Sequence, residues 1–514
     1  MDTLFLDESL VEAEFLYQQG LPPQATYLFK HALIQDAAYQ SLLRSTRQQY
    51  HQRIAQVLEA QFPETVKTQP ELLAYHYTEA GLTEQAVPYW QRAGQQASDR
   101  SAHLEAISHL TTGIELLKTL PETPEHTQQA VSLYIALGAA LQTAKGFGAP
   151  EVEDVYAQAY ALCQRVGETP QLVPVLYGLW RFYTGRSQFH RTRELGETFL
   201  RLAQRAEDPV LAVIAHYALG MTWWCLGALP TARPHLEEAS AHYTPEQRRV
   251  PVFRMGHDPG VACRGLTALT LWCLGYPAQA LVHVHEALAL AHALSHPFSL
   301  ALARCYTAYV YQFRRDVPAV HEHAEAAVAL ATEQRFPLWA AWGTSVHGWA
   351  LAMQNQGEEG LAQVRQGIAA CRAAGNVLCV PYFSALLAEV CAHLGHTEDG
   401  LQALAEAQTL IDQHEERWWE AEVCRLRGVV LLRQPETPQA EAEACFQWAL
   451  DVARRQQAKA LELRAAMSLS RLWQQQGKRT EAYELLAPTY NWFTEGFDTA
   501  DLQEAKALLE ELGR

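Results

Sequence analysis

The sequence predicts an all-α protein, an α-solenoid of stacked helical hairpins, and three observations lead to this prediction. The segment from Leu219 to Ala239 has the composition of two short helices joined by a tight turn at Gly227. In the second helix, Ala232, Leu236 and Ala239 are spaced so that they share one face. Similar segments recur along the chain. Because one such hairpin cannot bury its own apolar face, the copies are expected to stack on one another.

The repeated unit is a turn glycine followed by a small residue five places on, a large residue nine places on and a small residue twelve places on. Six segments follow this spacing, with two substitutions at the large or last small place: Gly81 with Ala86, Trp90 and Ala93; Gly227 with Ala232, Leu236 and Ala239; Gly275 with Ala280, Val284 and Ala287; Gly357 with Ala362, Gln366 and Ala369; Gly395 with Gly400, Leu404 and Ala407; Gly477 with Ala482, Leu486 and Thr489. The pattern is typical of tetratricopeptide-like (TPR-like) hairpins, with a period of about 38–48 residues instead of about 34.

The amino-acid composition argues against a disordered chain, a nucleic-acid-binding protein and a membrane protein. Of 514 residues, 49% are hydrophobic and 19% charged, which is unlike a disordered chain. The net charge of −17 argues against a nucleic-acid partner, because phosphate binding requires clustered basic side chains. The ten cysteines form no CxxC pair. No long apolar run or secretory leader is present, so we expect no membrane partner and a cytoplasmic protein with reduced thiols.

The first 68 or so residues do not follow the repeat. We expect a helix from Leu4 to Gln19, a short strand over residues 25–29 and an amphipathic helix from His31 to Leu43. The next helix is expected to begin at Ser45 or Thr46. The residues expected to face inward are Leu33, Ala37 and Leu42 in the first of these two helices and Tyr50, Ile54, Val57 and Leu58 in the second.

A resemblance to a known family enters in this region. The residues that carry it are Phe29, His31, Leu33, Ala38 and Tyr39, together with the segments Gln69–Ala97 and Phe253–Val261. They resemble the region that follows the ATPase module in bacterial STAND-type signalling ATPases, which are often fused to class III adenylate or guanylate cyclases. In that family the motif Phe-x-His-x-Leu-x-x-x-x-Ala-Tyr lies at the C-terminal end of a winged-helix subdomain. The resemblance implies that residues 1–68 are a winged-helix-like remnant with linker helices.

The chain lacks the family's catalytic motifs. It contains no GxxxxGK[ST] phosphate loop and no recognisable cyclase domain. We therefore predict no enzymatic activity, no catalytic residue, no cofactor and no metal site. Neighbouring histidines such as His283 and His285 are two residues apart and would point in different directions on a helix. The chain resembles the C-terminal part of such a protein.

The repeats are expected to form a right-handed superhelix of about eleven helix pairs over residues 69–497. Residues 498–514 are expected to form a capping helix, because Leu502, Ala505, Leu508 and Leu509 lie on one stripe. A long connection between Tyr243 and Gly260 interrupts the pattern. Long loops often carry function, so the polar residues in it are candidates for a binding site: Arg254, His257 and Asp258. The alternative is that this loop only packs across a groove.

The candidate binding groove is the concave face of the superhelix. Trp224 and Trp272 each lie three residues before a turn glycine, on the side expected to face inward to the groove. Four other residues are predicted on the same side: Tyr217, Met221, Leu269 and His347. Aromatic concave surfaces bind peptides or helices in solenoid proteins. The alternative is that neighbouring helices cover these side chains.

The sequence therefore favours a non-catalytic scaffold or sensor region. It would bind a protein, a peptide or a small ligand and regulate an attached or partner signalling ATPase or cyclase. The alternative is the C-terminal fragment of a protein whose annotation names the cyclase or ATPase itself. A role in transcription through the winged-helix remnant is a weaker hypothesis, since the chain is acidic.

Overall fold

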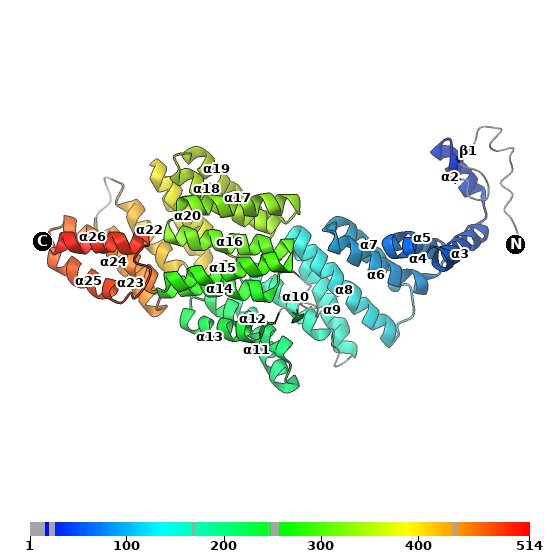
Figure 1. The fold of residues 1–514 in the computed structure, drawn as a ribbon, viewed down its shortest axis with the longest axis horizontal. Coiled ribbons are helices and arrows are strands. Elements are labelled where there is room, and N and C mark those ends of the chain that lie inside the picture. The colour runs from blue at the N-terminus through cyan, green and yellow to red at the C-terminus, as the bar shows by residue number, and fades with distance from the viewer. Residues whose placement is uncertain are drawn as a thin grey trace. The chain divides into compact units, whose positions relative to one another are not determined.

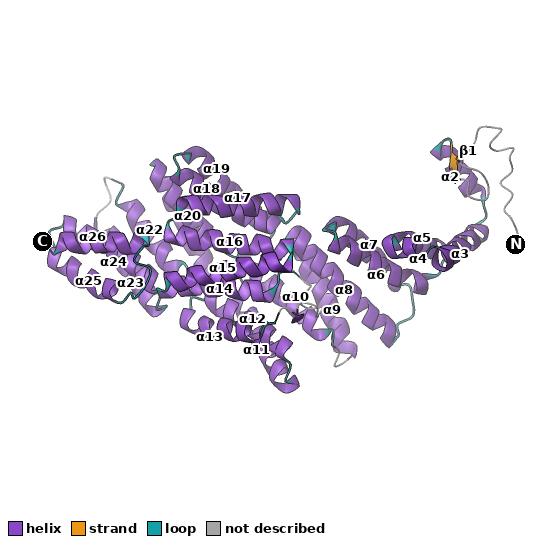
Figure 2. Ribbon diagram, in the orientation of Figure 1, coloured by secondary structure: helices purple, strands orange, loops and turns teal. Residues whose placement is uncertain are grey.

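The computed structural model describes residues 16–19, 26–166, 170–244, 246–247, 256–434 and 439–513. The chain divides into two compact units, one of Met1–Asp99 with Ser108–His126 and one of Arg100–Ile107 with Thr127–Arg514. The described residues form twenty-five helices and one two-stranded sheet (Figure 2). The predicted all-α, TPR-like solenoid is confirmed.

The described part of the first unit begins with a small antiparallel sheet. Strand β1 (Leu16–Gln19) pairs with β2 (Thr26–Phe29) so that Leu16 lies opposite Phe29. The helices that follow are α2 (Ala32–Ser41), α3 (Arg44–Gln61), α4 (Pro63–Thr68), α5 (Pro70–Glu79) and α6 (Thr83–Asp99), and α7 (His103–Leu117) contributes residues to both units. A small core joins α3 to α6 and contains Ala55, Val66, Leu73, Tyr77 and Ala86.

Three expectations for this unit are wrong. Residues 16–19 form a strand, not the end of a helix, and the rest of the expected helix from Leu4 lies outside the described residues. Helix α2 has no fully buried side chain, and Leu33 and Ala37, which were expected to face inward, are exposed. In α3 the buried residues are His51 and Ala55, whereas three residues expected to be buried are exposed: Tyr50, Ile54 and Val57. Periodicity identifies an apolar face but not what covers it.

The second unit is a stack of hairpins. Even-numbered helices are the first helices of their hairpins and odd-numbered helices the second: α8 (Pro124–Lys145), α9 (Pro150–Val166), α10 (Leu172–Gly185), α11 (Phe189–Ala206), α12 (Pro209–Cys225), α13 (Leu229–His242), α14 (Pro259–Leu274), α15 (Pro277–Leu294), α16 (Pro297–Arg314), α17 (Val317–Glu333), α18 (Pro337–Met353), α19 (Gly357–Ala373), α20 (Val380–Leu394), α21 (Thr397–His414), α22 (Glu420–Leu431), α23 (Gln439–Arg455), α24 (Lys459–Gln475) and α25 (Arg479–Asn491). Figure 1 shows consecutive helices such as α14, α15 and α16 side by side.

A residue in the left-handed conformation ends the first helix of most hairpins. These residues are Ser187, Gly227, Gly275, Arg315, Asn355, Gly395 and Gly477, all with positive φ. Glycine adopts this conformation without strain and is the usual choice after a helix, but other residues also occur. Several of these positions lie forty residues apart, for example Arg315, Asn355 and Gly395.

The hairpin of α18 and α19 corrects the predicted register. The turn residue is Asn355, not Gly357, which is the first residue of α19. Counting from Asn355 places Gly360, Val364 and Gly367 at the small, large and small positions, and all three are buried. Ala362, Gln366 and Ala369 were therefore assigned two residues too late. A pattern that begins at a glycine is displaced by two residues here, because the turn residue is an asparagine.

Five hairpins complete one turn of the superhelix. The end of the first helix of a hairpin therefore meets the start of the first helix of the hairpin five repeats later, ten helices further along the chain. The contacts are Phe147, after α8, with Trp339 of α18; Gly185 of α10 with Val377, before α20; Cys225 of α12 with Arg417, before α22; Trp272 of α14 with Arg464 of α24; and Arg314 of α16 with Asp498, before α26. Helix α26 (Ala500–Leu512) then packs on the last hairpins through Leu502, Ala505, Leu508 and Leu512.

None of the described helices combines the length and the apolar composition needed to cross a bilayer.

Candidate functional site in the interior of the superhelix

The interior of the second unit is filled by aromatic side chains. Trp180, Trp224, Trp339, Trp349 and Trp418 are among its largest fully buried residues. They come mainly from the first helices of the hairpins, whose inner faces meet where successive turns of the superhelix touch. Indole and phenol rings contribute large apolar areas to such contacts and favour stacked or edge-to-face geometry.

The predicted groove residues lie in this packed interior. Five of the six are at most 5% exposed: Tyr217, Met221, Trp224, Leu269 and Trp272. The ring of Trp224 stacks on Trp418 with centroids 4.3 Å apart, and Trp272 lies 4.7 Å from Phe313. The prediction that these side chains face an open groove is wrong, because all five are buried, and Trp224 and Trp272 are covered by residues of the next turn of the superhelix, Trp418 and Arg464.

His347 lies elsewhere. Its side chain is half-buried, its Nδ1 is 2.8 Å from Oε1 of Gln363 in α19, and its ring lies 4.8 Å from that of His321 in α17. His347 therefore contributes to packing between neighbouring hairpins, and the structure does not bring it together with the other predicted groove residues.

The predicted loop residues have different outcomes. Arg254 lies outside the described residues. Asp258 is buried and caps α14, since its Oδ1 accepts a hydrogen bond from the amide of Val261 at 3.1 Å. Its Oδ2 accepts another from the hydroxyl of Tyr243 at 2.8 Å. His257 is buried, and its Nε2 lies 2.7 Å from the hydroxyl of Tyr217. One loop candidate and one groove candidate therefore meet in the interior.

Arg181 of α10 joins this cluster and was missed from the sequence. Its guanidinium lies over the ring of Phe147, 4.2 Å from the centroid, and only 2% of the residue is exposed. Burial lowers the pKa of Arg181, and burial together with nearby Arg181 holds the pKa of His257 well below its usual value. The available signal was a single charge in the otherwise apolar or uncharged sequence of α10.

Four indole groups in the interior have no acceptor for their N–H among the described residues. They belong to Trp180, Trp224, Trp339 and Trp342. The ring centroids of Trp339 and Trp342 are 5.2 Å apart, and the centroid of the His257 ring lies 6.4 Å from that of Trp339. A buried donor without an acceptor costs about 1–3 kcal/mol. The interior therefore holds several donors that an acceptor-bearing group would stabilise.

A buried carboxylate lies where α12 and α22 meet. Glu416 accepts hydrogen bonds from the amide of Cys379 at 2.8 Å, from Nε1 of Trp418 at 3.1 Å and from the hydroxyl of Ser187 at 3.2 Å. Burial raises the pKa of Glu416 to about 7, although the three hydrogen bonds oppose the shift. Ser187 lies in the connection after α10, whereas Cys379 and Trp418 come just before α20 and α22. The Glu416 carboxylate therefore links two successive turns of the superhelix.

A charged network lies further along the interior. Arg464 is 4% exposed and pairs with Oε1 of Glu422 at 3.3 Å and with Oδ2 of Asp501 at 2.7 Å. Arg425 pairs with Glu422 at 2.8 Å. Burial alone would raise the pKa of Glu422, but Arg425 and Arg464 outweigh it and lower that pKa to about 2. The guanidinium of Arg464 also donates to the carbonyl oxygen of Phe313 at 2.5 Å.

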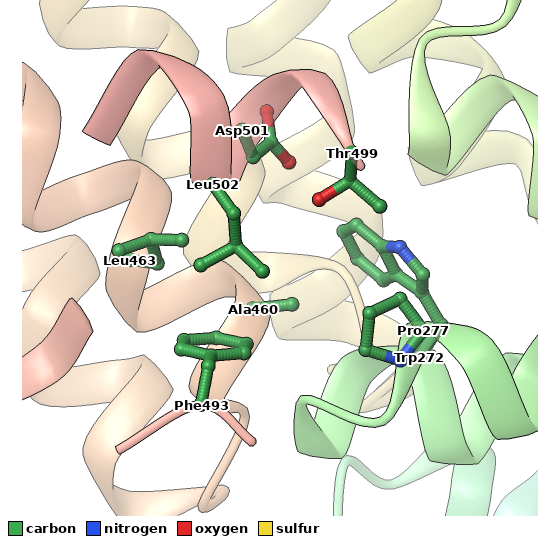
Figure 3. Close-up of a pocket in the computed structure, with 8 residues that line it drawn as sticks. All are labelled: Trp272, Pro277, Ala460, Leu463, Phe493, Thr499, Asp501 and Leu502. Atoms are coloured by element: carbon green, nitrogen blue, oxygen red, sulfur yellow. The ribbon is translucent and has the colours of Figure 1, made fainter. Parts of the chain in front are cut away.

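A small apolar hollow borders this network (Figure 3). It is lined by Trp272, Pro277, Ala460, Leu463, Phe493, Thr499, Asp501 and Leu502. Asp501, its one charged side chain, is already paired with Arg464 and lies 3.6 Å from Arg315. Glu495, just before this segment, accepts hydrogen bonds from the amides of Ala278 and Gln279 at the start of α15. The hollow is therefore part of the contact between turns.

The cysteine side chains lie almost entirely in the interior. All ten cysteines are free thiols, and nine are buried. Burial raises the pKa of Cys225 and Cys379, which makes these thiols poor nucleophiles. Within the described ranges, no group of three or more His, Cys, Asp or Glu side chains could hold a metal ion.

We compared the chain with protein families and with curated protein sequences. No family model matches the chain. An uncharacterized protein of Rhizobium meliloti (strain 1021) is 25% identical over 470 residues, which cover 90% of this chain and 45% of that protein. The chain thus spans less than half the length of this relative.

Two solved structures are also similar. The crystal structure of a Rap protein complexed with competence and sporulation factor has a TM-score of 0.50 and 13% identity, over 75% of this chain and 99% of that one. A STAND protein with a tetratricopeptide repeat sensor from Pyrococcus horikoshii has a TM-score of 0.38 and 13% identity, over 75% of this chain and 54% of that one. The first of these likenesses shows that the chain has a TPR-like helical solenoid fold.

Proposed function

We propose that this chain is a non-catalytic scaffold or sensor region. It binds a protein, a peptide or a small ligand and regulates a signalling ATPase or cyclase, either attached to it or separate, in the cytoplasm. The repeat architecture supports this proposal, as does the resemblance of residues 29–39 to the region after the ATPase module of STAND proteins. TPR-like solenoids act by contact with other molecules.

The observation that carries the proposal is the composition of the interior where turns of the superhelix meet. The turns are joined by a few polar contacts, such as the hydrogen bond from the amide of Val377 to the carbonyl oxygen of Gly185 at 2.9 Å. Between them lie the indole donors of Trp180, Trp224 and Trp339, for which the described residues provide no acceptor. A ligand with carbonyl or carboxylate acceptors would satisfy these donors.

The filled interior supports a mechanism in which ligand binding opens the superhelix. The described residues leave no open groove for a ligand to enter, because the predicted lining side chains Tyr217, Met221, Trp224, Leu269 and Trp272 are buried. Binding must therefore be coupled to separation of the turns, and the ligand selects the open form. Separation breaks the contacts between turns and displaces one end of the second unit relative to its other end. That displacement is the signal passed to the ATPase or cyclase.

A second candidate has one supporting observation, the length of the Rhizobium relative, of which this chain spans 45%. In this view the chain is the C-terminal part of a cyclase or ATPase whose catalytic residues lie in the remainder of the polypeptide. Adding the missing polypeptide would then create nucleotide turnover that does not respond to ligands of the superhelix.

The test uses the purified chain and the peptide and metabolite fraction of a bacterial extract. The proposal predicts that a subfraction raises the melting temperature and increases hydrogen exchange at the amide of Val377, as the turns separate. It also predicts no hydrolysis of ATP or GTP by the chain. The proposal fails if no subfraction changes either quantity, or if the chain hydrolyses nucleotides.

A further inference from the structure

One face of α3 carries an apolar stripe that remains exposed. Leu43, the N-cap residue of α3, is 74% exposed, and Tyr50, Ile54 and Val57 within the helix are 43%, 42% and 38% exposed. They follow one another at intervals of seven, four and three residues, which places them on one side of the helix. At a rise of 1.5 Å per residue the stripe is roughly 21 Å long.

This stripe is distinct from the face by which α3 packs. His51 and Ala55 are buried on that face, and Leu58 packs against the core of the first unit. The hydroxyl of Tyr39 and a ring nitrogen of His76 hold His51 at 2.9 and 2.8 Å. Helix α3 is thus apolar on two sides. A soluble helix needs one apolar side, so the second side indicates an interaction surface.

Basic side chains flank the stripe. Arg53 is three residues from Tyr50 and four from Val57, and Arg47 is three residues from Tyr50 on the other side. Arg53 and Arg44 are exposed, and neither forms an ion pair within the described part of the chain. Arg47 lies over the ring of Tyr39, 5.1 Å from its centroid. This local positive charge occurs in a chain with a net charge of −17.

We propose that the stripe on α3 docks an acidic amphipathic helix of a protein partner. The apolar edge of that helix covers Leu43, Tyr50, Ile54 and Val57, and its carboxylates pair with Arg47 and Arg53. A helix of about four turns matches the length of the stripe. Charge complementarity gives specificity and accelerates association, and the buried apolar side chains supply most of the affinity.

Two other occupants fit the charges less well. In a symmetric dimer the stripe would face its own copy, which would bring the arginines of the two chains together. An anionic bilayer would attract the stripe but repel the acidic remainder of the chain. The acidic helix alone matches both the apolar and the charged parts of the surface.

The proposal goes beyond the proposed function, because α3 belongs to the first unit and the sensing interior to the second. Loss of helix docking would leave ligand-induced exchange at Val377 unchanged. Conversely, failure of the sensor proposal would not affect binding at α3, so the two results can be distinguished.

The test measures the fluorescence anisotropy of a labelled peptide titrated with the full chain. The peptide is a helix of about 16 residues with leucines along one stripe and glutamates beside it. Ile54→Glu is expected to weaken binding at least about tenfold, and Arg53→Glu to weaken it by about threefold or more and reduce its salt dependence. Tyr483→Glu is the matched control, since Tyr483 on α25 is 43% exposed, and should change nothing.

The charge-reversed peptide, with lysine in place of glutamate, should not bind. The proposal is overturned if the glutamate peptide does not bind, if Ile54→Glu leaves its affinity unchanged, or if the lysine peptide binds equally well. Dimerisation that Ile54→Glu abolishes, without peptide binding, would assign the stripe to a second copy of the chain. Binding to phosphatidylserine vesicles that depends on Ile54 would assign it to a membrane, and either result contradicts the proposal.

Discussion

The backbone amide of Arg417 donates a hydrogen bond to the carbonyl oxygen of Cys225 at 2.8 Å, although five hairpins separate the two residues. Cys225 is the last residue of α12, and Arg417 precedes α22. The amide of Val377 makes the same contact with Gly185 at the end of α10. Helix ends leave carbonyl groups without partners, and here the next turn of the superhelix supplies the donors. The negative end of one helix dipole thereby meets the positive end of another.

Stacking of Trp224 on Trp418 should contribute strongly to stability. We expect Trp418→Ala to lower the free energy of unfolding by about 3–5 kcal/mol, because the change leaves a cavity between two turns. Trp448→Ala is the control, since Trp448 is 48% exposed, and should have a small effect. Urea denaturation of the variants measures both changes. Equal effects of the two substitutions would contradict the described contact between turns.

The charged network predicts that replacing Arg464 lowers the free energy of unfolding strongly. Arg464→Met leaves the buried Glu422 and the partly buried Asp501 with one fewer counter-ion, so we expect a loss of about 3–5 kcal/mol. Arg471, on the same helix as Arg464, forms an exposed ion pair with Glu504 of α26, and Arg471→Met should cost less than about 1 kcal/mol. Denaturant titrations at neutral pH compare the two variants. A small effect at Arg464 would mean that the network is exposed to water.

The pKa of Glu416 predicts a dependence of stability on pH. Its folded pKa is raised to about 7 from 4.5, so the folded state binds the proton more tightly and this group's contribution to stability falls as pH rises from about 4.5 through about 7. Glu416→Gln is neutral throughout. Its stability relative to the wild type should therefore increase between pH 5 and pH 8, by on the order of 3 kcal/mol.

Urea midpoints at the two pH values measure this difference. Glu415→Gln is the matched control, because it makes the same substitution at an adjacent but exposed carboxylate. A constant difference between wild type and Glu416→Gln would show that the Glu416 carboxyl titrates at its usual value.

Close approach of α18 and α19 predicts that Gly360 does not tolerate a side chain. A Cβ at Gly360 would lie 2.4 Å from the carbonyl oxygen of Gly348 and 2.7 Å from the amide of Ala352, both backbone atoms. We expect Gly360→Ala to destabilise the chain by about 1–3 kcal/mol. Gly400 holds the equivalent position in α21, where the nearest atom is 3.4 Å away, so Gly400→Ala should be neutral or slightly stabilising. Thermal unfolding distinguishes the two variants.

Local features of the fold were predictable from the sequence. The spacing after Gly227, Gly275 and Gly395 identified helical hairpins, because each turn places the same helix face against its neighbour. Turns at Ser187, Arg315 and Asn355 were missed, since these residues adopt the left-handed conformation without being glycine. Their backbone conformation is imposed by the helices on either side.

The interior could not be predicted from single hairpins. Trp224 and Trp272 were placed on the inner side, but a pattern within one hairpin contains no information about the hairpin five repeats away that covers them. The charge of Arg181 likewise has no meaning until the Phe147 ring is placed beneath it. The same limit applies in reverse to Ile54, which has the spacing of a buried residue and yet is exposed.

The most direct test of the account is single-residue hydrogen exchange at the amides of Val377 and Arg417. Neither residue lies within a helix, so only the hydrogen bonds to Gly185 and Cys225 in the preceding turn protect these two amides. The account predicts that both amides exchange slowly and that Trp418→Ala accelerates the exchange of Arg417. Exchange at the rate of an unprotected loop amide in the wild-type chain would contradict a superhelix that closes on itself after five hairpins.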